Sequence, residues 1–458
     1  MMRFSIVVRA RRAGVAALMG LAFVGCDSKI LEITDPDIIN PEDLNSVVGA
    51  EALRNGVLTR LQAATSGESA DNVFLFGGML ADEWRSGDTF EQRNTTDQRS
   101  LAGTPRNGLF ATSNSFIAPQ FRAYMRIREQ GQQAIEATRA KAPTPLAPIG
   151  LMFALKAYAA VTMGEYFCNG IPFSRAEGPL IIPGNPVSVD SAFRIAANDA
   201  DSATANNDAT GPAAADVRYL ALVIKARALL DRNLPASITG LAAVPTTWVF
   251  KVNHSANTSS NNLWSLNTNA KRYVLGNVEG GVGLNYRAAN DPRLPTSAGG
   301  NAFDSQTPFI AQLKWARYDP VTIVSGVEAR LIEAEVQWRT DTVGAVNRVT
   351  VTNQLNAIRA TAGLLPAGSA ALAPLAVPAT PSAMLDLIMR ERAFWMFSTG
   401  HRLGDLRRLV KYYGRAANSV YPNGAYPKGG TYGAFMVMPL PDAERNNPNF
   451  NGCTDLNP

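Results

Sequence analysis

Apolar residues recur along most of this chain at helical spacing, and Pro, Gly and Asn separate the periodic segments. The helices that this spacing predicts are 119–139, 148–167, 188–206, 212–232, 327–339, 346–362, 381–397 and 402–413, the last with Gly414 as its C-cap. An earlier helix is expected to begin at Pro41, with Asn40 as its N-cap, and to continue through Leu61. Strands are expected to be few and short. Neighbouring helices of this length favour a mostly α fold built from tetratricopeptide-like helix pairs, although the strict repeat consensus is absent.

Two long segments interrupt the helices. Residues 66–115 are rich in Gly, Ser, Thr and Asn and are expected to form loops with short helical pieces. Residues 235–325 are irregular but carry scattered aromatic residues, which favour order over disorder in so long a segment. The expected organisation is a signal peptide at 1–25, a tether at 26–40, a helical region at 41–234, and a loop-rich insertion with a C-terminal helical region at 235–458 that forms one compact unit with it.

The first 25 residues have the layout of a secretory signal. Four arginines precede a short apolar run, Ala13 to Val24, which is too short to cross a hydrocarbon core of about 30 Å. Gly25 then precedes Cys26, at the position where a lipoprotein signal peptidase would cut. We expect Cys26 to carry lipid that attaches the mature chain to a membrane. The alternative is an ordinary signal peptide followed by a chance cysteine.

Removal of this segment changes the charge of the protein. The whole chain has 43 basic and 38 acidic residues, but four of the arginines and none of the acids lie in residues 1–25. The mature chain therefore has a net charge of about +1, which gives no reason to expect a nucleic-acid partner. No stretch after the signal is expected to span a membrane.

Cysteine and histidine are scarce. After lipidation of Cys26 the remaining thiols are Cys168 and Cys453, and export to an oxidising compartment favours a disulfide between them. Two unrelated thiols are the alternative. His254 and His401 lie far apart in unlike surroundings, so no His-rich metal site is expected, and no cofactor is implied. Recognisable catalytic and nucleotide-binding motifs are absent.

The C-terminal helices carry many charged residues of both signs, namely Glu333, Glu335, Arg359, Glu391, Arg392, Arg402, Asp405 and Arg407. Because each carboxylate has an arginine nearby in sequence, we interpret the set as a structural ion-pair network. The alternative is an acid/base pair of a glycoside hydrolase, which needs two carboxylates about 5–9.5 Å apart flanking a sugar.

The order of motifs over nearly the whole mature chain resembles the SusD/RagB family of outer-membrane nutrient-binding lipoproteins. The motifs are 33–36 and 40–44, 80–83, 154–158 with 164–167 and 169–172, 291–293, 328–335, 355–359, 390–392, 400–408, 439–441 and 446–449. This resemblance implies a helical protein on the cell surface that binds glycans or peptides and passes them to a TonB-dependent transporter of the SusC type. It also implies that the protein is not an enzyme.

Aromatic residues in the two irregular segments are the candidate ligand contacts, because sugar rings need flat apolar faces with polar groups nearby. They are Trp84 and Phe90 in the first segment, and Trp248, Trp264, Tyr273 and Tyr286 in the second. The resemblance implies that ligand sites arise from these same regions. The alternative is that these rings plug the loops onto the helical body. In that case the chain could be a lipid-anchored helical scaffold without a small ligand.

Substitution Cys26→Ala tests the lipid anchor. Without the thiol that accepts the lipid, we expect the protein to be released from the membrane or to accumulate as unprocessed precursor. Fractionation of cells followed by immunoblotting measures this. A variant that still fractionates with the outer membrane would show that another feature holds the chain there.

Overall fold

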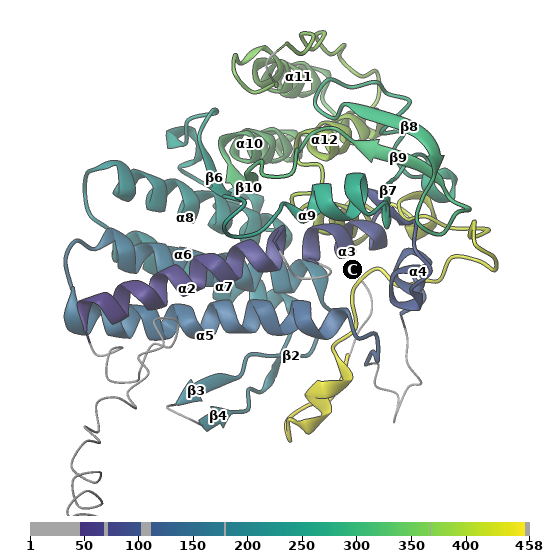
Figure 1. Cartoon of the computed structure of the whole chain (residues 1–458). Coiled ribbons are helices and arrows are strands. Elements are labelled where there is room, and N and C mark those ends of the chain that lie inside the picture. Colours follow the sequence, from purple (N-terminus) through teal and green to yellow (C-terminus); the bar gives the residue numbers. More distant parts are fainter. Residues whose placement is uncertain (1–45, 68–71, 102–110, 178–179, 367, 454–458) are drawn as a thin grey trace, which may run out of the picture.

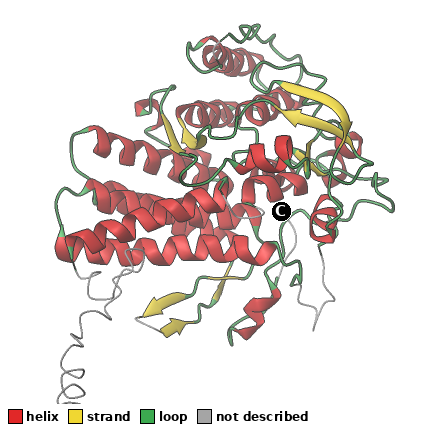
Figure 2. Ribbon diagram, viewed as in Figure 1, coloured by secondary structure: helices red, strands yellow, loops and turns green. Residues whose placement is uncertain are grey.

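The computed structural model describes residues 46–67, 72–101, 111–177, 180–366 and 368–453. The signal peptide, Cys26 and the tether lie outside these residues, as do the predicted helix start at Asn40 and Pro41. The mostly α fold predicted from the sequence is confirmed: helices dominate the molecule, and the strands are short (Figures 1 and 2).

Long helices of the first half of the chain lie side by side (Figure 1). They are α2 (Val47–Thr65), α5 (Ile117–Lys141), α6 (Ala147–Tyr166), α7 (Val189–Ala205) and α8 (Pro212–Asp231). Each packs on its neighbour in this order, and α6 also contacts α8. Helix α2 begins at Val47 because Ser46 is extended and its side chain accepts a hydrogen bond from the Gly49 N–H, which is N-cap geometry.

Helix α6 corrects one expectation from the sequence. By length and composition it could cross a membrane, with a mean hydropathy of 1.3. However, 83% of its apolar window is buried inside the protein, because α5, α7 and α8 pack around it. Its apolar surface therefore serves as the centre of the helical core.

The second half adds α10 (Gly326–Thr340), α11 (Ala345–Ala360), α12 (Pro381–Trp395) and α13 (Arg402–Lys411). Helix α10 packs against α8 as well as α11 and α12, and α13 packs against α6 and α3 (Val73–Leu80). The two irregular segments carry α4 (Glu91–Asp97) and the short α9 (Asn262–Trp264).

The strands form antiparallel pairs. The pairs are β2 (Ile171–Pro172) with β5 (Pro186–Val187), β3 (Arg175–Glu177) with β4 (Leu180–Ile182), β6 (Val249–Val252) with β10 (Val321–Ser325), β8 (Thr296–Asn301) with β9 (Pro308–Gln312), and β1 (Trp84–Ser86) with β7 (Tyr273–Leu275). In the last pair Trp84 lies opposite Leu275 and Ser86 opposite Tyr273. This pair joins the two irregular segments.

A buried network of ion pairs holds the C-terminal helices together. Arg392 on α12 donates from Nε to both oxygens of Asp405 on α13, at 3.0 Å each. Arg408 donates to Asp405 at 2.7 Å, to Glu335 on α10 at 3.2 Å and to Asp231 on α8 at 2.8 Å. Burial disfavours the charged form of Asp405, but Arg392 and Arg408 outweigh it and hold the pKa of Asp405 well below its usual range.

Further pairs extend this network to other segments. Arg402 at the start of α13 donates to both oxygens of Asp82, at 2.6 and 2.8 Å, and so fixes the loop between α3 and β1. Arg227 on α8 donates from Nε to Glu165 on α6 at 2.6 Å. Two elements of the first half are thus tied to each other and to α13.

The predicted network is present, with two corrections. Glu333 is not part of it, because its carboxylate faces outward and pairs with Arg330 at 2.8 Å. Arg407 does not pair with a carboxylate, since its guanidinium donates to the backbone oxygens of Gly164 and Glu165 at the end of α6.

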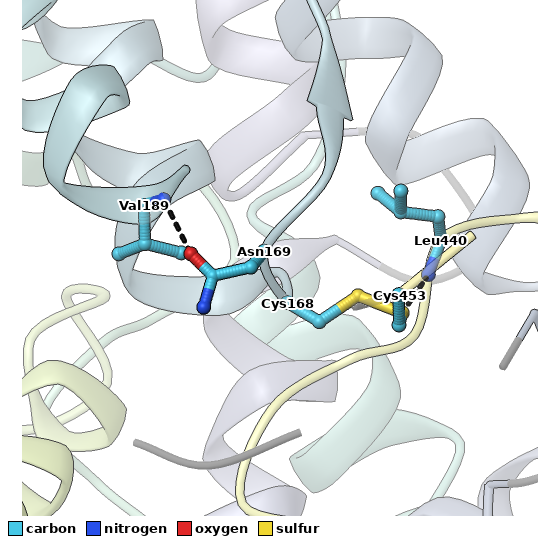
Figure 3. The surroundings of a disulfide bond; sticks show 5 residues. All are labelled: Cys168, Asn169, Val189, Leu440 and Cys453. Carbon is cyan, nitrogen blue, oxygen red and sulfur yellow. Dashed lines mark hydrogen bonds between the residues drawn. A yellow bond between two sulfur atoms is a disulfide. The ribbon is translucent and has the colours of Figure 1, made fainter. Parts of the chain in front are cut away.

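The C-terminal segment is held against the exit of α6. Met438 N–H donates to Tyr166 O at 2.7 Å, and Cys168 N–H donates to Met438 O at 3.1 Å. Cys168 and Cys453 form a disulfide, the pairing that the sequence predicts, with Cα atoms 5.6 Å apart. The Leu440 N–H donates to Sγ of Cys453 at 3.3 Å (Figure 3).

This disulfide is expected to stabilise the fold strongly. It spans 285 residues, and closure of so long a loop costs the unfolded chain up to about 5 kcal/mol on the entropic model. The double substitution of Cys168→Ser and Cys453→Ser should lower the free energy of unfolding by a few kcal/mol, measured by denaturant titration of residues 27–458. Thiol labelling of the denatured parent should give no free thiol before reduction and both after it. Two free thiols before reduction would contradict the disulfide.

Candidate functional site

Three of the six predicted aromatic contacts are core residues. Trp84, Tyr273 and Tyr286 are fully buried. Trp84 donates from Nε1 to the Ser398 hydroxyl at 2.8 Å, and its ring packs against Tyr273 and Phe397. Tyr286 packs against Phe397 as well. Because these rings have no open face in the structure, we reassign the three residues from the ligand site to the core.

Trp248 and Trp264 are half-buried, and each ring packs against neighbouring side chains. Trp248 precedes β6, donates from Nε1 to Asp216 at 2.8 Å, and packs edge-on against Tyr219 of α8. Figure 1 places β6 beside α8 and away from α4. Trp264 ends α9, where the guanidinium of Arg317 lies 5.9 Å from its ring centroid.

Phe90 is the predicted contact that is exposed, and the structure brings a second exposed ring to it. Phe90 and Phe303 are 46% and 47% exposed. The guanidinium of Arg272 lies 5.1 Å from the centroid of Phe90 and 3.8 Å from that of Phe303. We call these three residues the Phe90–Arg272–Phe303 surface. It offers two flat apolar faces with a hydrogen-bond donor between them.

A buried carboxylate positions this surface. Asp88 is 1% exposed and accepts two hydrogen bonds from Nη1 of Arg272, at 2.9 and 2.8 Å. Arg93 pairs with the same carboxylate and also approaches the Phe90 ring. Burial disfavours the charged form of Asp88, but the bond from Arg272 and the charge of Arg93 outweigh it and lower its pKa. A charged Asp88 therefore keeps Arg272 in place at neutral pH.

The surface is assembled from three separate segments. The Phe303 N–H donates to Lys271 O at 3.0 Å, and the Asp304 N–H donates to Gly87 O at 2.9 Å. A Cβ on Gly87 would lie 2.5 Å from that of Ala302, so this approach requires glycine. Both irregular segments that the sequence singled out therefore meet here.

A third segment completes the assembly. Lys428, from the loop after α13, donates to Asp88 O at 2.8 Å and to the Asn94 side chain at 2.9 Å. Its ammonium also lies 2.8 Å from the Asp304 carboxylate. Beside Phe90, a polar hollow of about 150 Å³ lies between α4 and residues 112–114, lined in part by Gln92. Hydroxyl-bearing ligands thus have polar partners near the exposed rings.

Sequence reasoning missed Phe303 and Arg272. Phe303 lies in a turn with Asn301, Asp304 and Ser305, and an apolar aromatic among turn-forming polar residues is the only local signal of an exposed role. Arg272 gives no such signal, because its partner Asp88 is 184 residues away in sequence.

The arrangement of carboxylates offers no support for hydrolysis. One small hollow brings Glu165 and Asp231 together, but both are ion-paired, with Arg227 and Arg408 respectively. In the part of the chain that the structure describes, no group of three or more His, Cys, Asp or Glu residues is placed to hold a metal ion. The chemistry available at the exposed rings is binding.

Glu83, which precedes Trp84 in sequence, is a buried carboxylate. Its Oε1 accepts a hydrogen bond from the Ser398 N–H at 2.7 Å. The pKa of Glu83 is raised to about 8, mainly by burial and also by the neighbouring Asp82 carboxylate, against the opposing effect of the Ser398 bond. Burial lowers the pKa of nearby Lys314 to about 8, so both groups titrate at mildly alkaline pH in the folded protein.

No family model matches the chain, and no curated protein matches it in sequence. Solved structures do match it. A SusD-like carbohydrate-binding protein from Bacteroides fragilis NCTC 9343 has a TM-score of 0.63 at 13% identity, over 89% of this chain and 99% of that one. A laminarin-binding SusD-like protein has a TM-score of 0.59 at 13% identity, with the same coverage.

A SusD superfamily protein from Bacteroides vulgatus ATCC 8482 has a TM-score of 0.56 at 15% identity, over 90% of this chain and 99% of that one. The chain therefore has the SusD-like fold over nearly its full described length. The resemblance predicted from the sequence motifs is confirmed at the level of the fold.

Substitution Glu83→Gln should change the pH dependence of stability. The raised pKa means that the folded chain binds this proton more tightly than the unfolded chain, whose value is near 4.5. The contribution of protonated Glu83 to the free energy of unfolding is therefore complete below pH 4.5 and is lost as the pH rises to about 8. We expect the parent to lose stability relative to Glu83→Gln on the order of 1 kcal/mol per pH unit in this window, measured by urea unfolding. Parallel curves for the two proteins would contradict the raised pKa.

Proposed function

We propose that this chain is a cell-surface lipoprotein that binds a glycan or another oligomeric nutrient. The observation that carries the proposal is the Phe90–Arg272–Phe303 surface, in which two exposed rings flank a guanidinium fixed by buried Asp88. Aromatic faces can cover the apolar faces of sugar rings, while guanidinium and amide groups donate to hydroxyls. The names of structural neighbours support a carbohydrate ligand, since two are described as SusD-like carbohydrate-binding proteins and one as laminarin-binding.

The same proposal includes delivery of the ligand to a TonB-dependent transporter of the SusC type. Lipid on Cys26 would anchor the chain to the outer membrane, and the array of α2 and α5 to α8 would offer an extended face to a large partner. Binding without bond cleavage is the proposed mechanism, because Asp88, the buried carboxylate that positions the surface, is engaged by Arg93 and Arg272.

A second candidate function is a lipid-anchored helical scaffold without a small ligand. The burial of Trp84, Tyr273 and Tyr286 favours it, because these rings serve the core. The two candidates differ in one property that can be measured directly, namely whether the purified protein binds an oligosaccharide.

Residues 27–458 should bind at least one polysaccharide in a panel of laminarin, starch, xylan and inulin, screened by affinity electrophoresis and measured by calorimetry. Substitution Phe303→Ala or Phe90→Ala should weaken that binding about tenfold, because each removes one stacking face at a cost of about 1–2 kcal/mol. Both side chains are half exposed, so the thermal midpoint should stay near that of the parent.

Val346→Ala serves as the matched control, since it truncates an 81% exposed apolar side chain on α11, outside the surface. Its affinity should equal that of the parent. No binding to any member of the panel would favour the scaffold. Release of reducing ends during incubation would show hydrolysis and contradict the proposal.

A further inference from the structure

A second hollow lies between α12 and α13, built from residues that the Phe90–Arg272–Phe303 surface does not use. Its volume is about 300 Å³, at the small end of the range for small-molecule sites. Its apolar walls come from two helices and two loops, and consist of Val282, Leu284, Met389, Leu406, Leu409 and Val420.

Arginine side chains stand at the edge of these apolar walls. Arg402 and Arg415 line the hollow, but each is neutralised: Arg402 donates to both oxygens of Asp82, and Arg415 donates to Asp386 at 2.6 Å. Arg390 also lines it and differs from both. Its nearest carboxylate, Glu391, is 4.0 Å away.

Glu391 is already engaged by two other arginines. Its oxygens accept hydrogen bonds from Arg293 at 2.7 and 3.2 Å and from Arg359 at 2.6 Å, and Arg293 also pairs with Asp291 at 2.6 Å. This cluster thus holds three guanidinium groups against two carboxylates. Of the three, Arg390 has the longest pairing, 4.0 Å to Glu391, and its guanidinium also lies 4.6 Å from the centroid of the Phe394 ring.

We propose that this hollow binds a monoanionic carboxylic acid with an apolar body. The carboxylate would pair with the Arg390 guanidinium, which can donate two parallel hydrogen bonds to it. The apolar body would cover the side chains of the walls. A single negative charge fits, because the cluster holds one more guanidinium group than carboxylates and Asp386, which also lines the hollow, repels a second anionic group.

Calorimetry on residues 27–458 tests this with decanoate and 2-naphthoate as aliphatic and aromatic probes, and decan-1-ol as the uncharged comparison. At least one of the two acids should bind saturably with a Kd below about 1 mM. Decan-1-ol should bind about tenfold more weakly than the preferred acid. Binding of one acid and not the other identifies the shape of the apolar body.

Substitution Arg390→Gln should weaken binding of the acid about tenfold and leave binding of the alcohol unchanged. Arg390→Lys keeps the charge and should retain most of the affinity. Arg194→Gln, on an exposed arginine of α7, is the matched control and should bind as the parent does. The proposal is overturned if neither acid saturates below about 1 mM, if Arg390→Gln binds the acid like the parent, or if decan-1-ol binds as tightly as the acid.

Discussion

The pairing of Arg392 and Arg408 with Asp405 fixes how α12 and α13 lie against each other, and Glu335 adds α10 to the same cluster. A buried charge without a partner costs several kcal/mol, so these helices cannot shift without leaving an arginine unpaired. Arg402 carries the constraint to Asp82 and thus to the loop that leads into β1. These ion pairs thus fix the relative positions of α10, α12 and α13.

This constraint reaches the candidate ligand surface through a short path. Asp82 precedes Trp84, whose burial against Phe397 anchors β1, and the pairing of β1 with β7 brings Arg272 next to Asp88. Two buried carboxylates therefore position this region. Asp82 holds the loop before β1, and Asp88 holds the guanidinium of Arg272. The exposed rings stand on a rigid base, which lowers the entropy that ligand binding would cost.

The sequence predicted the helical scaffold well because its signals are local. The predicted helices at 188–206, 212–232 and 381–397 are α7, α8 and α12, with Pro212 as the first residue of α8 and with Ser188 and Thr380 as the N-caps of α7 and α12. The ligand surface could be assigned only to two segments. Whether an aromatic ring is buried depends on partners far away in sequence: Trp84 is buried by Ser398 and Phe397, whereas Phe90 six residues later is exposed. No local pattern distinguishes these two rings.

The turn that carries Phe303 has a property that follows from how it is held. Its backbone is fixed by bonds to Lys271 O and Gly87 O, and Asp304 accepts bonds from the N–H groups of Gln306 and Thr307. None of these bonds involves the side chain at 303, which projects outward. Evolution can therefore exchange that side chain freely while the turn keeps its shape. Selection for a new ligand acts on the side chain at position 303, whereas selection for stability acts on the backbone bonds that hold the turn. A change of ligand specificity therefore need not reduce the stability of the fold.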